Sequence, residues 1–256
     1  MANTVYNNKV IEARLNDLLA TSLNTRSLMT IDNSLTQSAG MIRTINRYDY
    51  TGVAEELAEG EDNTGVGSLN HTPYDYEVKR VQHTFEYTDD EFYRDNTVVD
   101  NGVKGANITM TNKMTADFFA ECAKATKSHS AATIGYEAIV DAIAELKLEN
   151  ESKLFVVIPQ SWLADIRKDE DYKSARYGEV VYNGMVATVA GIPVIASKAA
   201  TEGYVMTKEA VNLIMKKDVE VEQSRDIGKK KNKVVLSTYY ICALVDASQI
   251  CKITKA

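Results

Sequence analysis

The sequence has few of the side chains from which catalytic and metal sites are usually built. Its 256 residues include only three histidines, three cysteines and three prolines. His71, His83 and His129 do not stand beside cysteine or aspartate at the spacing of a metal site. No G-x-S-x-G nucleophile elbow occurs, and no glycine-rich segment matches a phosphate-binding loop. The sequence therefore predicts no catalytic residue, no metal ligand, no cofactor and no enzymatic activity.

The cysteines do not point to a disulfide framework. Cys122, Cys242 and Cys251 form no C-x-x-C pair, and their odd number leaves one without a partner. Cys122 shares a predicted helical face with Met114 and Phe118, which is typical of core packing. We therefore expect buried, reduced thiols, as in a protein made inside a cell.

Long hydrophobic segments are missing as well. No apolar run approaches the ~20 residues that cross a bilayer. The first residues, MANTVYNNKVIEARLNDLL, lack the apolar core of a secretory signal. We expect no membrane partner.

The net charge of −7 is concentrated in one segment. Residues 51–95 contain twelve acidic and three basic residues, whereas the rest of the chain has a net charge of +2. An acidic chain without a basic tail is a poor candidate for tight nucleic-acid binding.

The N-terminal third alternates between regular and irregular segments. Periodicity predicts an amphipathic helix over 8–24 and strands over 41–50 and 77–87. Residues 51–73 between these strands contain four glycines, one proline and five acids. Such a segment buries little surface, so we predict an extended hairpin with a projecting acidic tip.

The remaining chain predicts a mixed α+β fold. Thr88 and Glu91 form a capping-box pattern. We predict helices over 105–127, 134–148, 160–169 and 208–215. We predict strands over 153–159, 186–190, 194–197, 203–207, 219–226, 234–245 and 248–253, with a basic turn over 227–233.

The segment VATVAGIPVIASKAA, residues 186–200, contains two short apolar runs around a turn. Gly191 permits a positive φ, and Pro193 is predicted to help the chain reverse direction. We interpret both as structural residues.

Three segments in this order resemble the major capsid proteins of tailed bacteriophages, which have the Hong Kong 97-like fold. The first is DYTGVAEELAEGEDNTGVGSLNHTPYDYEVKRVQHTFEYTDDEF, which resembles the family's extension loop. The second is VAGIPVIASKAA, which resembles its G-x-P-V-x-x-S turn. The third is VEVEQSRDIGKKKNKVVLSTYYICALVDASQICKI, which resembles its closing strands. The resemblance extends from about residue 30 to the end.

The resemblance implies a division of the chain into five parts. Residues 1–40 would be the N-terminal arm, and 41–87 the extension loop with its base strands. Residues 88–132 would form a peripheral domain with a long spine helix. Residues 133–218 would form the axial domain, and 219–256 would return to the peripheral domain.

The resemblance also implies a function. Many copies would form pentamers and hexamers of an icosahedral head in the virion, assembled in the bacterial host cytoplasm. The partners would be other copies, a portal, scaffolding or decoration proteins, and packaged double-stranded DNA bound without sequence specificity.

The charges suggest one contact between neighbouring copies. We hypothesise that an acidic tip on one subunit meets a basic turn on the next. The tip residues are Glu55, Glu56, Glu59, Glu61 and Asp62, and the turn residues are Lys229, Lys230, Lys231 and Lys233. Charge pairs at an interface rim fix register more than affinity.

The chain departs from the family pattern in two ways. Some members join a lysine of the extension loop covalently to an asparagine of a neighbour. Asn232 stands where that asparagine would be, but residues 48–78 contain no lysine. We therefore expect a non-covalent shell. Larger members begin with a scaffolding segment that is removed, and we expect none here.

Two alternatives stay open at this point. An encapsulin-like nanocompartment shell would share the fold but enclose a cargo protein instead of DNA. A soluble α/β enzyme would need a pocket with converging titratable groups, for which the sequence offers no candidate residues.

Overall fold

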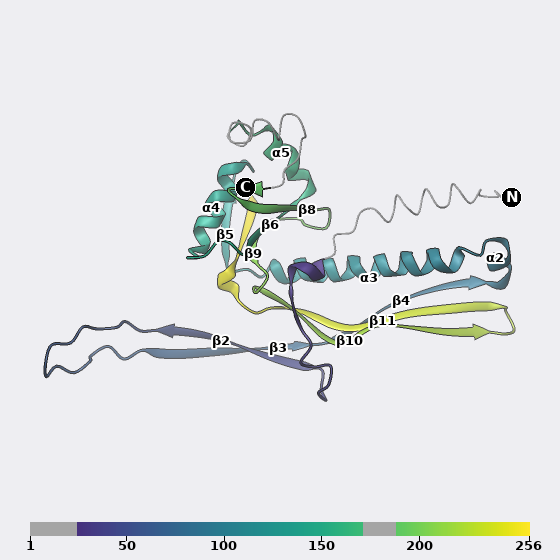
Figure 1. The fold of residues 1–256 in the computed structure, drawn as a ribbon, viewed down its shortest axis with the longest axis horizontal. Helices are drawn as coiled ribbons and strands as arrows, with labels where there is room; N and C mark the ends of the chain where they lie inside the picture. Colours follow the sequence, from purple (N-terminus) through teal and green to yellow (C-terminus); the bar gives the residue numbers. More distant parts are fainter. Residues whose placement is uncertain (1–24, 171–187) are drawn as a thin grey trace.

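The elongated shape is set by one long helix lying beside a long, narrow sheet (Figure 1). The computed structural model describes residues 25–170 and 188–256, so the predicted helix over 8–24 lies outside the described residues. These residues form two sheets and a separate two-stranded ribbon. The predicted α+β class is confirmed.

The narrow sheet has four strands in the order β1-β10-β11-β4. They are β1 (Thr30–Asp32), β10 (Val211–Asp226), β11 (Lys231–Leu244) and β4 (Lys79–Thr88). β10 and β11 are antiparallel from the Val211–Leu244 pair to the Asp226–Lys231 pair. β4 is antiparallel to β11 along its whole length, and β1 pairs in parallel with the beginning of β10.

The second sheet has six strands in the order β5-β12-β9-β6-β8-β7. They are β5 (Lys127–Ala131), β12 (Ile250–Lys255), β9 (Gly203–Thr207), β6 (Leu154–Pro159), β8 (Ile192–Ser197) and β7 (Thr188–Val189). Every residue of β6 and β9 is buried, as the continuous apolar run of β6 predicted. The short elements nearby are α4 (Tyr136–Leu146), η2 (Gln160–Trp162), α5 (Leu163–Lys168) and η3 (Ala247–Gln249).

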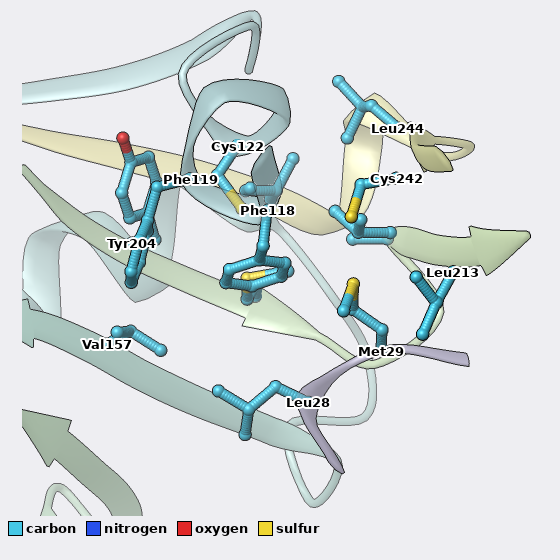
Figure 2. Close-up of a cluster of buried hydrophobic side chains, with 14 of the residues drawn as sticks. Leu28, Met29, Phe118, Phe119, Cys122, Val157, Tyr204, Leu213, Cys242 and Leu244 are labelled. Atoms are coloured by element: carbon cyan, nitrogen blue, oxygen red, sulfur yellow. The ribbon is translucent and has the colours of Figure 1, made fainter. Parts of the chain in front are cut away.

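One hydrophobic core joins the two sheets at the end of helix α3 (Val98–Cys122) (Figure 2). Phe118 and Phe119 lie edge to face with ring centroids 5.2 Å apart, and Phe119 stacks on Tyr204 of β9 at 6.0 Å. Leu213 of β10 and Cys242 of β11 belong to the same cluster. Truncating a buried phenylalanine to alanine typically costs about 3–5 kcal/mol, so this contact is a major support of the fold.

The three cysteines are free and buried, as predicted. Burial raises the pKa of the Cys242 thiol to about 12 and raises the pKa of Cys122 well above its usual value. Because the thiolate is the reactive form, these thiols are protected both by burial and by protonation.

Helix α3 begins seven residues earlier than the predicted start at 105. The capping box is confirmed, and it opens a short helix as predicted, α2 (Asp89–Arg94). The Thr88 hydroxyl accepts from the Glu91 amide at 3.2 Å, and the Glu91 carboxylate accepts from the Thr88 amide at 2.9 Å. The sequence prediction missed the first turns of α3 because Gly102 and Gly105 lower helix propensity there.

The predicted hairpin is wrong in its second strand. Strand β2 (Ile42–Thr51) pairs with β3 (Ser68–Glu77), not with the 77–87 segment. That segment is β4, which leaves the hairpin and joins the four-stranded sheet. The predicted loop over 51–73 therefore shortens to residues 52–67. Pro73 had argued against a strand, but proline is tolerated in an edge strand.

The helix predicted over 208–215 is also wrong. Strand β10 starts at Val211, and Leu213, Ile214 and Met215 are all buried. A short apolar run does not distinguish a buried strand from a buried helix. The long β11 partner decides in favour of the strand.

The turn in the 186–200 segment lies one residue earlier than predicted. Ala190 and Gly191 have φ values of 50° and 82°, so these two residues make the reversal between β7 and β8. Pro193 is already inside β8, opposite Thr188. The predicted strand residues 186 and 187 lie outside the described residues.

The strands of the two sheets are not separated at residues 133 and 218, the boundaries that the family resemblance implies for the axial domain. The six-stranded sheet includes β5 and β12, which lie outside that range, whereas β10 from Val211 onward belongs to the four-stranded sheet. Long-range strand pairing causes the difference, because β12 lies between β5 and β9.

Two glycines in the first turns of α3 give a matched pair of stability predictions. A Cβ at Gly102 would collide with the Phe85 ring of β4, whereas a Cβ at Gly105 would meet no atom within 4 Å. Gly105→Ala should raise the free energy of unfolding by about 0.5–1 kcal/mol. Gly102→Ala should be less stable than Gly105→Ala by about 1–3 kcal/mol because the helix and strand must separate. Urea unfolding of both variants measures the difference, and equal stabilities would contradict the close packing of α3 on β4.

Candidate inter-subunit surfaces

The ribbon, defined as β2, β3 and the connecting residues 52–67, has one face that packs against the body. Residue pairs such as Ile45 and Tyr74 place odd-numbered β2 residues and even-numbered β3 residues on this face. Ile45 and Tyr76 pack against a small buried cluster in the body, which consists of Leu35, Val78, Ile214 and Ala243. The ribbon is therefore anchored only at its base.

The opposite face of the ribbon carries large apolar side chains without cover. Tyr48 lies opposite His71, with ring centroids 6.1 Å apart, and Tyr50 lies opposite Leu69. The exposed fractions of Tyr48, Tyr50 and Leu69 are 64%, 67% and 62%. A contiguous exposed apolar surface usually marks an interaction site. We call these four residues the aromatic face.

The five acidic residues of the predicted tip all lie exposed between β2 and β3. The Glu55 carboxylate accepts from the Thr64 amide at 3.1 Å and from the Thr64 hydroxyl at 3.3 Å, which ties the two arms of the loop together. Among the described residues, no lysine or arginine forms an ion pair with any of the five. The tip therefore presents negative charge that no described lysine or arginine neutralises.

The basic turn is only partly free for a partner. Lys231 forms an ion pair with Glu86 of β4, and Lys233 approaches the same carboxylate at 3.9 Å. The hydrogen bond from Lys231 lowers the pKa of Glu86. Lys229 and Lys230 form no ion pair within the described part of the chain and are exposed. These two lysines are the better candidates for an external contact.

A polar network holds the basic turn against the start of α2. Asp89 accepts from Arg225 at 2.7 Å and from Asn232 at 2.8 Å. The Asp89 amide also donates to the Lys230 carbonyl at 3.0 Å. Asn232 is thus engaged inside its own subunit.

The acidic tip and the basic turn lie at opposite ends of the molecule. The ribbon extends away from the body in one direction, whereas the β10–β11 turn and α2 lie at the other extreme (Figure 1). The tip and turn of one chain therefore do not meet. Tyr93 and Ile227 near the basic turn are also 83% and 75% exposed.

The sequence prediction found the charges but missed the aromatic face. Its signal was present in the alternation of Tyr48 and Tyr50 in β2, yet the partner strand had been assigned to a loop. The prediction placed His71 in that loop, whereas the structure places it in β3 beside Tyr48.

The described residues contain no group of three or more histidine, cysteine, aspartate or glutamate side chains placed to hold a metal ion. No helix in the same ranges has the length and hydrophobicity required to cross a membrane.

Comparison with known proteins identifies the fold through structure alone. No protein family model matches the sequence, and no curated protein matches it. The capsid of the cyanophage P-SCSP1u is similar, with a TM-score of 0.73 at 14% identity over 92% of this chain and 89% of that one. A structure from Mycobacterium phage Che8 has a TM-score of 0.65 at 13% identity over 91% of each chain. A virus-like particle from Pyrococcus furiosus has a TM-score of 0.64 at 9% identity over 94% of this chain and 96% of that one.

These similarities cover nearly the whole chain. With the geometry described above, they show that the chain has the Hong Kong 97-like fold of tailed-phage major capsid proteins.

Proposed function

We propose that this protein is a major capsid protein that self-assembles into an icosahedral phage head around double-stranded DNA. The observation that carries the proposal is the ribbon, which projects from the body with an exposed aromatic face that the described residues of its own chain do not cover. The capsid fold supports the same function. Pentamers and hexamers would be the building units, and the protein would be structural, without catalysis.

Burial of the aromatic face would supply much of the association energy. Each square ångström of apolar surface removed from water contributes about 25 cal/mol. Tyrosine is well suited to such contacts because its ring is apolar and its hydroxyl can hydrogen-bond to water at the edge of the interface. A neighbouring subunit is the natural cover because many identical copies would be present.

The charges would set the direction of assembly. The acidic tip of one subunit would contact Lys229 and Lys230 of its neighbour, while Lys231 and Lys233 would keep Glu86 in place. A contact between two different ends of the same molecule is heterologous, and repeated heterologous contacts close into rings. Rings of five and six subunits are compatible with this arrangement.

The two sheets would serve different places in the shell. We assign the six-stranded sheet, with the Gly191 turn at its edge, to the axial domain around the capsomer axes. We assign the four-stranded sheet and α3 to the peripheral domain. A portal and scaffolding or decoration proteins would be further partners in the virion, and assembly would take place in the bacterial host cytoplasm.

An encapsulin-like shell is the alternative with the same fold. A virus-like particle from Pyrococcus furiosus is among the similar structures, so a closed shell with other contents is the second candidate. The two functions differ in the contents of the shell, so the contents give the decisive test.

Electron microscopy of the purified chain, combined with nuclease digestion of native particles, tests the proposed function. Closed polyhedral shells that protect long double-stranded DNA are expected. Shells that hold a protein cargo and no DNA would favour the encapsulin-like alternative. A monodisperse monomer under all assembly conditions would contradict both functions.

A charge exchange tests the contact between tip and turn. Glu56 and Glu59 are suitable because, among the described residues, neither carboxylate accepts a hydrogen bond as the Glu55 carboxylate does from Thr64. Glu56→Lys with Glu59→Lys, or Lys229→Glu with Lys230→Glu, should slow shell formation about tenfold because like charges then meet. The two pairs of changes combined should restore the parent rate. The contact is absent if either pair alone leaves the light-scattering rate of assembly unchanged.

A denaturing gel tests the expected absence of covalent joining. Asn232 is engaged by Asp89, and residues 48–78 contain no lysine that could attack it. Mature shells boiled in detergent should give a single band at 28.3 kDa. A ladder of multiples of that mass would show that another lysine performs the reaction.

A further inference from the structure

The base of the ribbon is joined to the body through one arginine. The Arg47 guanidinium donates from Nη2 to the carbonyl oxygen of Leu244. The Tyr76 hydroxyl donates to the same carbonyl at 3.2 Å, and Arg47 Nη2 lies 3.4 Å from that hydroxyl. Arg47 and Tyr76 come from the two strands of the ribbon, so both strands are tied to one point on the body.

The surroundings of Arg47 are unusual for a charged side chain. Its Cζ lies 4.2 Å from the centroid of the Tyr74 ring. Its Nε is buried without a hydrogen-bond partner, and no carboxylate of the described residues forms an ion pair with it. The cation is held by a ring face and a carbonyl oxygen instead. We call Arg47, Tyr74, Tyr76 and the Leu244 carbonyl the Arg47 clamp.

The clamp ends at the junction of the two sheets. Leu244 is the last residue of β11, and the chain continues from it through η3 into β12 of the six-stranded sheet. The ribbon is otherwise fixed to the body by the small cluster around Ile45 and by the ion pair of Arg43 with Asp32 of β1. The Val78 amide donates to the Met41 carbonyl at 2.7 Å and closes the base of the ribbon itself. A small rotation at this base moves the distant acidic tip a long way.

We propose that Arg47 is a positioning residue that sets the angle between the ribbon and the body, and thereby the curvature of the shell. The proposal rests on the proposed function, because curvature has meaning only in a closed assembly. The angle decides where the tip reaches a neighbour, and a single angle favours a single shell diameter. A clamp of carbonyl and ring contacts is directional, so it restricts the angle more than apolar packing does.

Arginine is suited to this position for a reason that lysine does not share. Its planar guanidinium donates in plane to the Leu244 carbonyl and Tyr76 while its face covers Tyr74. A lysine ammonium is a compact point charge and offers no planar face for stacking. Arg47→Lys therefore keeps the positive charge but removes the planar group that donates to the Leu244 carbonyl and stacks on the Tyr74 ring.

Spin labels on the full, unassembled chain measure the angle directly. Asn70→Cys on β3 and Asn107→Cys on α3 place two exposed thiols on the ribbon and the body. The three native thiols are buried, so they do not compete for the label. The distribution of distances between the labels should be narrow in the parent and roughly twofold broader in Arg47→Lys and Arg47→Ala.

Arg43→Ala is the matched control. Arg43 lies on the same strand and the same face of the ribbon, but its contact is a single ion pair at 3.7 Å between its exposed guanidinium and the half-buried Asp32 carboxylate. Such a pair contributes little, so the distance distribution should stay as narrow as in the parent. Tyr76→Phe removes only one hydroxyl of the clamp and gives a mild second variant if Arg47→Ala does not fold.

Electron microscopy of assembled shells gives the second readout. Arg47→Lys and Arg47→Ala should give a mixture of diameters and open sheets, whereas Arg43→Ala should give the diameter of the parent. Parent-like distance widths, or uniform shells of parent diameter, in both Arg47 variants would overturn the proposal. If the parent itself forms no shells, the proposed function fails, and the label distances still decide whether Arg47 fixes the angle.

Discussion

The packing of Phe118 and Phe119 at the end of α3 is the contact on which the rest of the structure depends. These adjacent residues meet Tyr204 of the six-stranded sheet and lie in one cluster with Leu213 and Cys242 of the four-stranded sheet. Because the core is closed here, both the ribbon and the β10–β11 turn can extend into solvent without loss of the fold.

The consequence is a molecule that completes its own core but leaves its two ends unsatisfied. One end is acidic and carries exposed tyrosines, and the other combines the basic turn with the acidic first turn of α2 and carries Tyr93 and Ile227. The internal ion pairs around Glu86 and Asp89 stiffen the basic end and reduce its free positive charge to Lys229 and Lys230. Chemically different ends are suited to directional association between copies.

Sequence patterns predicted the elements whose signal is local. The apolar run of β6 and the capping box of Thr88 and Glu91 both correspond to elements in the structure. The prediction was wrong where a distant partner decides the conformation. Residues 208–215 become a turn and a strand because β11 pairs with them, and residues 77–87 leave the hairpin for the same reason. For the candidate surfaces, the charges were visible in the sequence, but Arg47 and the aromatic face were not recognised.

The sequence by itself determined the mixed fold class, the buried state of the cysteines, and the concentration of acidic and basic residues in two short segments. These properties follow from composition and from local periodicity, which can be read directly from the sequence. Only the tertiary structure decided that the two charged segments lie at opposite ends of the molecule. It also decided that Lys231 and Lys233 interact with Glu86, and that Arg47 donates a hydrogen bond to the carbonyl of Leu244. Each of these three features depends on contacts between residues that are far apart in the chain. The free energy of such contacts depends on tertiary packing, which no local sequence pattern encodes.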